Sequence, residues 1–421
     1  MTESKLNFSA GDYVLLRLAK KEIEGRILES YDKEIILIKL KSGYNIGIAR
    51  ENILDFKVLK KFKEDVKNEI KTSFDDHKKT IGLIVTGGTI ASKLDAKTGG
   101  VTALAGVDEF AKFYPKLFEK VNVKMEIPFM ELSENMNWKH WIKIAEITKK
   151  MLNDKDIEGV IITHGSDFLH YTSSILSFFL KDLNKPVVLT FSQRSIDRAS
   201  SDAEMNLDCA VSFALGDCAE VVIVGHASTN DDFCYALQGN KVRKMHTSRR
   251  DTFKAVNTRE IAKVFRDKIE FLREYKPRNN GKTELDCSFN DKIALVKFYP
   301  GQDEGILDYY LKEKYKGIII EMSGLGHVNI GWIAKIKKLV KSGLFVFAVS
   351  QTIYGRLNPK VYSTGRELEK AGVIFLGDML SETAFVKLGF VLGHKNWRSR
   401  EKVREKMLGN FSGEFNELLS E

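Results

Sequence analysis

Residues 81–90 read IGLIVTGGTI, an apolar run that breaks into two glycines between two threonines. A second run of the same kind, GVIITHGSD, occupies residues 159–167. This pattern is typical of a buried parallel strand that delivers polar groups at its carboxyl end. In open α/β sheets, ligands bind at that edge. We therefore expect the two strand ends to meet in one crevice and to supply two hydroxyl groups and a carboxylate, a set suited to nucleophilic catalysis.

The chain around these runs alternates strand-like segments with helical patterns. Such alternation predicts parallel sheets joined by right-handed crossovers, and a polar stretch at 275–291 separates two sets. We predict two stacked α/β domains, an active-site domain at 81–285 and a second at 290–421. The expected strands are 81–86, 159–163, 186–191, 220–225, 292–299, 316–321, 343–349 and 372–376; the expected helices are 138–152 and 168–182, and 394–408 form a basic helical tail.

The first 60 residues differ from the rest of the chain in their sequence pattern. Short β-branched runs, punctuated by glycine and aspartate, predict that residues 1–60 form a small SH3-like antiparallel barrel. The highly charged residues 61–80 favour a short helix and a linker. The basic tail admits two interpretations: a helix packed on the body with a solvated charged face, or a docking element for RNA or a partner subunit.

Composition sets broad limits on the function. The net charge of +9 favours a polyanion partner only weakly, because basic and acidic residues are interspersed. The four cysteines show no metal-ligand spacing, which indicates buried small side chains in a reducing cytosol. No secretory leader and no run of ~18 apolar residues is present, so we expect a cytoplasmic protein without a membrane span. The histidines lack metal-ligand spacing, and Asn280-Gly281-Lys282-Thr283 has Lys276 where a phosphate-binding loop needs glycine, so we expect neither metal nor ATP here.

The chemistry of the two strand ends has competing interpretations. Glycines before Thr89 let the backbone approach a substrate, and a threonine hydroxyl becomes a nucleophile only when a base removes its proton. Ser166 and Asp167 suit proton handling, but both residue types also suit a helix N-cap. A lysine within 241–251 could relay that proton, whereas the same stretch also fits a basic surface loop.

Together these three segments resemble the asparaginase/glutaminase family with a threonine nucleophile. The resemblance implies that Thr89 is the nucleophile and that Ser166, Asp167 and Lys244 handle its proton. Ser166 stands where the family has threonine, which keeps the hydroxyl and implies reduced rigidity rather than lost chemistry. The resemblance also implies four substrate-binding residues. Ser133 and Glu134 would contact the α-carboxylate and the α-amino group of the substrate, and Gly88 and Gly165 would contact it through the backbone.

Five further segments and the N-terminal barrel resemble a branch of that family, the archaeal glutamyl-tRNA(Gln) amidotransferase D subunits. One departure is Ala199, where the branch usually has proline. The resemblance implies a glutaminase with a homodimer core and no cofactor of its own, which hydrolyses glutamine or asparagine. A partner subunit would use ATP and Mg to activate Glu-tRNA(Gln) and would receive the ammonia. A free-standing L-asparaginase and a non-catalytic RNA-binding scaffold remain alternatives. The five segments that carry the resemblance to the D subunits are residues 191–203, 246–251, 350–356, 362–367 and 379–384.

Overall fold

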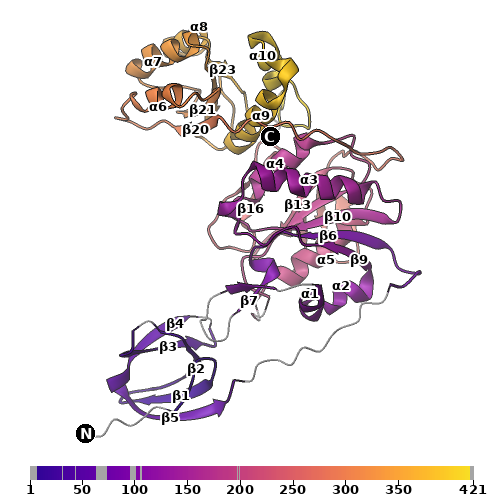
Figure 1. Ribbon diagram of the computed structural model, residues 1–421, viewed down its shortest axis with the longest axis vertical. Helices are drawn as coiled ribbons and strands as arrows, with labels where there is room; N and C mark the ends of the chain where they lie inside the picture. Colours follow the sequence, from indigo (N-terminus) through magenta and orange to yellow (C-terminus); the bar gives the residue numbers. More distant parts are fainter. Residues whose placement is uncertain are drawn as a thin grey trace.

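The computed structural model describes residues 7–417 except 31, 43, 63–73, 95–100, 105, 106, 197 and 199. Figure 1 shows a small all-β part at the N-terminal end, then a large α/β domain, then a second α/β domain at the C-terminal end. Most of the predicted linker at 61–80, and Ala199, lie outside the described residues. Within the described part, no helix has the length and apolarity that crossing a membrane requires.

The small N-terminal part is a five-stranded antiparallel sheet in the order β4-β3-β2-β1-β5. Alternate residues of its strands are buried, as in Val14 and Leu16, and they form one apolar core. Asp12 links the segment before β1 to the segment after β5. Its carboxylate accepts hydrogen bonds from the backbone N–H of Phe62 at 2.8 Å and of Ser9 at 3.0 Å. The strands are β1 (Tyr13–Leu18), β2 (Glu22–Leu28), β3 (Ile35–Leu40), β4 (Asn45–Ala49) and β5 (Ile53–Lys60).

The large domain contains an eight-stranded sheet in the order β18-β17-β14-β13-β12-β10-β6-β9. Five neighbouring strands, from β9 to β13, are parallel. The sequence predicts four of them, β6, β10, β12 and β13, whereas it missed β9. The other three are antiparallel additions that we did not predict. The strands are β6 (Thr80–Val85), β9 (Asn122–Glu126), β10 (Ile157–Thr163), β12 (Val187–Thr190), β13 (Val221–His226), β14 (Cys234–Gln238), β17 (Ala262–Val264) and β18 (Ile269–Phe271).

Helices cover both faces of this sheet. Ile162 and its same-face neighbours pack with α3 (Trp138–Leu152) and α4 (Leu169–Phe179), whereas Ile161 faces the cluster that includes α5 (Ala203–Ala214). The predicted helix at 168–182 is wrong at its C-terminal end. It stops at Phe179 because Leu180 and Lys181 form a short strand, β11, that pairs with β19 (Glu284–Leu285). Two short helices, α1 (Val107–Phe113) and α2 (Pro115–Lys120), precede β9.

The C-terminal domain is a parallel four-stranded sheet in the order β20-β21-β22-β23. The basic tail includes the last helix, α10. In this helix Val403 and Met407 are fully buried, whereas Arg404 is exposed. That arrangement fits the first interpretation of the tail. The elements are β20 (Ile293–Lys297), α6 (Ile306–Lys312), β21 (Gly317–Met322), α7 (Ile330–Lys341), β22 (Phe345–Ser350), α8 (Ser363–Lys370), β23 (Ile374–Phe375), α9 (Ser381–Gly393) and α10 (Arg400–Leu408).

The two α/β domains are joined by helices α4 and α9, which pack against each other. The Phe178 and Phe390 rings stack between them, with their centroids 6.0 Å apart. At the C-terminal end of this contact, Asp286 receives a hydrogen bond from Lys181 Nζ at 2.5 Å and another from His394 Nε2 at 2.9 Å. A single carboxylate therefore links the end of α4 to the end of α9.

This bridge makes a testable contribution to stability. Burial disfavours the Asp286 carboxylate, but hydrogen bonds from Lys181, His394 and Ser288 outweigh burial and lower its pKa to about 2. Because the folded pKa is below the unfolded value of about 3.9, the stabilisation is present above pH ~4 and is lost as pH falls toward 2. We expect Asp286→Asn to lower the free energy of unfolding by about 2 kcal/mol at neutral pH. Urea denaturation at several pH values measures this difference, which should vanish near pH 2.

Asp291→Asn, at an exposed residue of the same segment, is the control. A difference between wild type and Asp286→Asn that stays constant with pH would mean that the charge of Asp286 does not carry the stabilisation.

Candidate active site

The strand ends that carry the two glycine- and hydroxyl-containing segments lie side by side. Strands β6 and β10 are neighbours, and their register pairs Val85 with Thr163. The carbonyl oxygen of Thr163 accepts two hydrogen bonds from Thr86, one from its N–H at 3.2 Å and one from its hydroxyl at 2.8 Å. The segments that follow the two strands therefore begin at the same level of the sheet, as predicted.

The glycines are needed because backbones approach closely here. Gly87 and Gly88 have φ values of +125° and +80°, which side-chain-bearing residues rarely adopt. A Cβ atom at Gly88 would lie 2.5 Å from the backbone nitrogen of Gly165, and one at Gly87 would lie 2.3 Å from the carbonyl oxygen of Glu131. The chain then enters a short 3₁₀ helix, Thr89–Ala91, whose first residue is the half-buried Thr89.

The predicted proton-handling residues come together. Lys244 ends the short strand β15 (Val242–Lys244), and its Nζ donates hydrogen bonds to Ser166 Oγ at 3.0 Å and to Asp167 Oδ1 at 2.6 Å. The N-cap position of α4 is occupied by Phe168, without a capping side chain. The interpretation of Ser166 and Asp167 as an N-cap is therefore wrong. We call Ser166, Asp167 and Lys244 the lysine cluster.

The exposure of the lysine cluster is uneven. The Lys244 side chain is 10% exposed, whereas that of Asp167 is 63% exposed. An ion pair with one solvated partner is screened and weak. Lys244 therefore has a hydroxyl and a carboxylate within reach, but its ion pair with Asp167 alone does not fix the position of its Nζ atom.

The segment of Ser133 and Glu134, the two side chains predicted to bind the substrate, reaches the turn at Gly165. Ser133 begins a 3₁₀ turn, Ser133–Asn135, is buried, and its Oγ accepts a hydrogen bond from the N–H of Phe168 at 3.4 Å. A Cβ at Gly165 would lie 3.0 Å from Ser133 Oγ, so this serine packs directly on the turn before Ser166. Glu134 is exposed, and it lines a cavity of about 230 Å³ together with Ser133 and Phe168.

A buried hydrogen-bond chain, which the sequence analysis missed, supports the turn at Gly165. Trp141 Nε1 donates to Thr172 Oγ1 at 3.0 Å, and Thr172 Oγ1 lies 2.9 Å from His164 Nε2. His164 Nδ1 lies 2.7 Å from the Gly165 carbonyl oxygen. Because a carbonyl only accepts, Nδ1 carries the proton and Nε2 accepts from Thr172. Burial lowers the pKa of His164 to about 4, so the imidazole is neutral.

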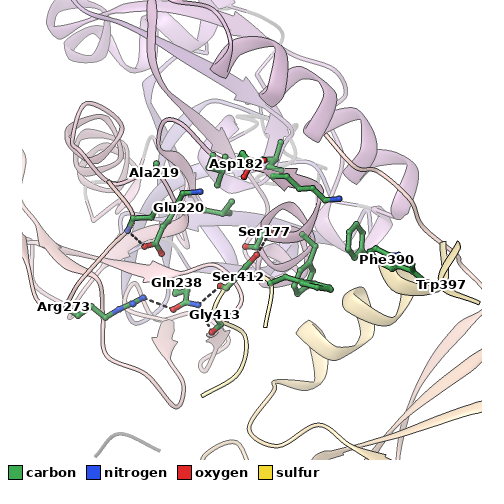
Figure 2. Close-up of a pocket in the computed structure, with 17 residues that line it drawn as sticks. Ser177, Asp182, Ala219, Glu220, Gln238, Arg273, Phe390, Trp397, Ser412 and Gly413 are labelled. Atoms are coloured by element: carbon green, nitrogen blue, oxygen red, sulfur yellow. Dashed lines mark hydrogen bonds between the residues drawn. The ribbon is translucent and has the colours of Figure 1, made fainter. Parts of the chain in front are cut away.

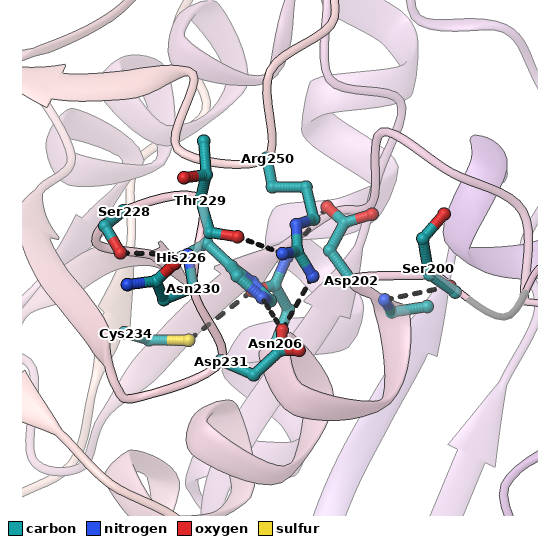
Figure 3. Close-up of polar contacts among 12 residues, drawn as sticks. Ser200, Asp202, Asn206, His226, Ser228, Thr229, Asn230, Asp231, Cys234 and Arg250 are labelled. Carbon is teal, nitrogen blue, oxygen red and sulfur yellow. Dashed lines mark hydrogen bonds and ion pairs between the residues drawn. The ribbon is translucent and has the colours of Figure 1, made fainter.

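A second polar network holds the loop that follows Lys244 (Figure 3). Arg250 Nη1 donates to Asp231 Oδ1 at 2.6 Å, and the same oxygen lies 2.9 Å from His226 Nε2. His226 Nδ1 in turn lies 2.5 Å from Asn206 Oδ1 on α5. Nearby, burial raises the pKa of Asp202, although the backbone N–H groups of residues 193 and 194 donate to its carboxylate. This network anchors the loop to α5 and β13 in the core of the domain.

A larger cavity, of about 630 Å³, contains none of the predicted site residues (Figure 2). It lies where α4 and α9 meet the C-terminal segment, and Gln238 donates to the carbonyl oxygens of Ser412 and Gly413 beside it. Arg273 Nη2 donates to Gln238 Oε1 at 2.7 Å. The described residues also contain no group of three or more His, Cys, Asp or Glu side chains arranged to hold a metal ion.

Three family models match successive parts of the chain. The model described as GatD N-terminal domain matches residues 8–59, Asparaginase, N-terminal matches 80–277, and Glutaminase/Asparaginase C-terminal domain matches 292–407. The glutamyl-tRNA(Gln) amidotransferase D subunit from Pyrococcus furiosus is 47% identical over 415 residues, which cover 96% of this chain and 94% of that protein. The chain belongs to the family of glutamyl-tRNA(Gln) amidotransferase D subunits.

More distant relatives agree with this assignment. The D subunit of Sulfurisphaera tokodaii is 41% identical over 419 residues, covering 98% of this chain and 93% of that protein. Among solved structures, the thermostable L-asparaginase from Thermococcus kodakarensis superposes with a TM-score of 0.71 at 28% identity, over 80% of this chain and 99% of that one. L-asparaginase I from Vibrio cholerae gives 0.69 at 26% identity, over 80% and 99%. The predicted family, the two-domain asparaginase-like fold after a small barrel, and the prediction of an amidohydrolase subunit are confirmed.

The neutral state of His164, which follows from its hydrogen bonds, can be tested directly. In ¹⁵N-histidine NMR spectra we expect its imidazole to carry the proton on Nδ1 and to protonate only near pH 4, because burial disfavours the cation. A His164→Asn variant identifies the signal. Protonation near the ordinary value of about 6.5, or a proton on Nε2, would contradict the hydrogen-bond assignment.

Proposed function

We propose that this chain hydrolyses the side-chain amide of glutamine or asparagine and supplies the ammonia to a partner subunit. The partner would use ATP and Mg to convert Glu-tRNA(Gln) to Gln-tRNA(Gln). The observation that carries the proposal is the lysine cluster: Lys244 bonds Ser166 and Asp167 beside the strand end that bears Thr89. In a chain of this family, that arrangement supports nucleophilic amide hydrolysis.

The first half of the reaction is acylation of Thr89. Its Oγ1 attacks the amide carbon while the hydroxyl proton passes to the lysine cluster. Backbone N–H groups near Gly88 and Ser166 stabilise the negative oxygen of the tetrahedral intermediate, since close backbone packing fixes them beforehand. The carbon–nitrogen bond then breaks, the nitrogen takes up the proton, and ammonia leaves an acyl-threonine ester.

The second half is hydrolysis of that ester. A water molecule attacks the ester carbon, and the lysine cluster accepts the water proton and returns it to Thr89 Oγ1. The products are glutamate, or aspartate from asparagine, and the free enzyme. Ser133 and Glu134 hold the α-carboxylate and the α-amino group, so that the side-chain amide faces Thr89. A buried hydroxyl and an exposed carboxylate suit these two groups in charge and hydrogen bonding.

ATP chemistry belongs to the partner in this proposal. The segment at 280–283 carries a structural threonine: Thr283 is buried, and its hydroxyl donates to Asn184 Oδ1 at 2.9 Å. A phosphate-binding loop instead needs a free hydroxyl and backbone N–H groups that point at the phosphates. We propose a homodimer core and a cytoplasmic location for the same complex.

The main alternative is a free-standing L-asparaginase. The solved neighbours carry that name, but at 26–28% identity, whereas the amidotransferase relatives match nearly the full chain, the barrel included. Copurification with the partner, and a rise in glutamine hydrolysis when the partner and Glu-tRNA(Gln) are added, support the amidotransferase role. Full hydrolysis by the isolated chain, unaffected by tRNA, favours the free-standing enzyme.

Thr89→Val tests the nucleophile. Valine keeps the shape of threonine and removes the hydroxyl, so we expect ammonia release from glutamine to fall to background. The complex should still amidate Glu-tRNA(Gln) when ammonium chloride replaces glutamine. A coupled glutamate assay and acid-gel analysis of the tRNA measure the two activities. Loss of both would mean that Thr89 is structural, and retention of both would remove it from the reaction.

Lys244→Met tests the proton path. Methionine fills most of the space of the lysine stem but cannot donate to Ser166 or Asp167. We expect kcat for glutamine hydrolysis to fall by about 10²- to 10⁴-fold, the usual range for a lost acid–base group, with an unchanged circular dichroism spectrum. Lys254→Met, at a lysine paired with Asp251, serves as the control. An unchanged rate in Lys244→Met would exclude the lysine from the mechanism.

A further inference from the structure

A buried carboxylate from the second α/β domain reaches the neighbours of the lysine cluster. Glu382 lies in the first turn of α9, and its side chain is only 6% exposed. Its Oε1 lies 3.2 Å from Arg243 Nε and 3.7 Å from His170 Nε2. Burial disfavours the charge on Glu382, but His170 and Arg243 outweigh burial and lower its pKa.

These two contacts are informative because of what lies next to them in the chain. Arg243 immediately precedes Lys244 on β15, where successive side chains point to opposite faces. Arg243 therefore reaches Glu382, whereas Lys244 reaches Ser166 and Asp167. His170 lies three residues after Asp167, in the first turn of α4. A single carboxylate thus touches both chain segments that supply the lysine cluster.

The lysine cluster needs such a support. Because Asp167 is mostly exposed, its ion pair with Lys244 is screened by water. Glu382 and His170, by contrast, are buried, where charges interact more strongly and hold a fixed geometry.

The buried contact is also costly to keep. Among the described residues, Glu382 Oε2 and His170 Nδ1 are buried without a hydrogen-bond partner. An unsatisfied buried polar atom costs about 1–3 kcal/mol. Both side chains line a cavity of about 420 Å³ that also reaches Asp167 and Lys244. An arrangement that served stability alone would be improved by an apolar residue here.

We propose that Glu382 is a positioning residue for amide hydrolysis. It holds β15 and the start of α4 together, so that Lys244 Nζ stays within hydrogen-bond distance of Ser166 and Asp167. It touches neither the substrate nor Thr89 in this role and acts through Arg243 and His170. The inference rests on the proposed function and assigns the second α/β domain a part in the chemistry of the first.

The molecule offers a matched control at the other end of the same two helices. Asp286 also bridges a cation of the first domain, Lys181, and a histidine of the second, His394. Its contacts lie at the ends of α4 and α9, whereas those of Glu382 lie at their beginnings. Removing either charge weakens the domain contact, but Glu382 alone of this pair contacts residues next to the lysine cluster.

The experiment compares Glu382→Gln with Asp286→Asn in the full chain. We expect Glu382→Gln to lower kcat about 10- to 100-fold at 25 °C with KM changed less than about threefold, because substrate contacts remain. Asp286→Asn should keep kcat within about twofold although it unfolds at lower urea. A parental kcat in folded Glu382→Gln would overturn the proposal.

A double-mutant cycle separates positioning from a general loss of structure. If Glu382 acts through Lys244, adding Glu382→Gln to Lys244→Met should leave kcat unchanged, whereas independent effects would multiply and overturn the proposal. If Glu382→Gln does not fold, Arg243→Met, at a half-buried partner, tests the same link with the same expected loss. Retained activity in Thr89→Val would instead contradict the proposed function itself, so the two failures are distinguishable.

Discussion

The close approach of the Gly88 and Gly165 backbones is the constraint on which the site depends. Adjacent parallel strands bring their carboxyl ends to one level. A side chain at Gly88 would force the two segments apart, and one at Gly165 would press on Ser133. At Gly88 the added Cβ would meet backbone atoms, which cannot move aside as a flexible side chain can. The same contact brings Thr89 from β6 and Ser166 from β10 to the same edge. In the proposed function, the nucleophile and the residues that take up its proton therefore come from one edge of the sheet.

The side chains that hold this backbone contact in place are polar and buried. Ser133 packs on Gly165 from one side, and the chain from Trp141 through Thr172 to His164 holds the Gly165 carbonyl from the other. A neutral imidazole suits this place, because a buried cation would demand a counter-charge beside the proposed catalytic hydroxyls. In the proposed reaction, the same hydrogen bonds would fix the backbone N–H groups that stabilise a developing negative oxygen. The residues that hold the turn in place would thus also serve the proposed chemistry.

The parts predictable from sequence were the continuous apolar runs that end in glycine and hydroxyl residues. The β6 and β10 runs are buried almost throughout, so their apolar pattern identified parallel strands and the edge where they end. The three-residue strands β17 and β18 are too short for any period to appear, and β11 replaced the last turn of a helix because of a pairing with β19 far along the chain. Lys244 could be selected from its basic stretch only through the family resemblance. The roles of His164 and Glu382 depend on partners distant in sequence, which no local pattern reveals.

The serine at 166 changes how that site is held in place. A threonine is stiff about its first side-chain torsion because its Cβ is branched, whereas serine has three accessible rotamers. In this chain the rotamer is selected by a hydrogen bond, since Ser166 Oγ accepts from Lys244 Nζ at 3.0 Å. The orientation of the hydroxyl therefore depends on the position of the lysine, and the lysine depends on β15. Because serine lacks the methyl group that stiffens threonine, the geometry at this position depends on Lys244 and on β15, whose Arg243 contacts Glu382 of the second domain.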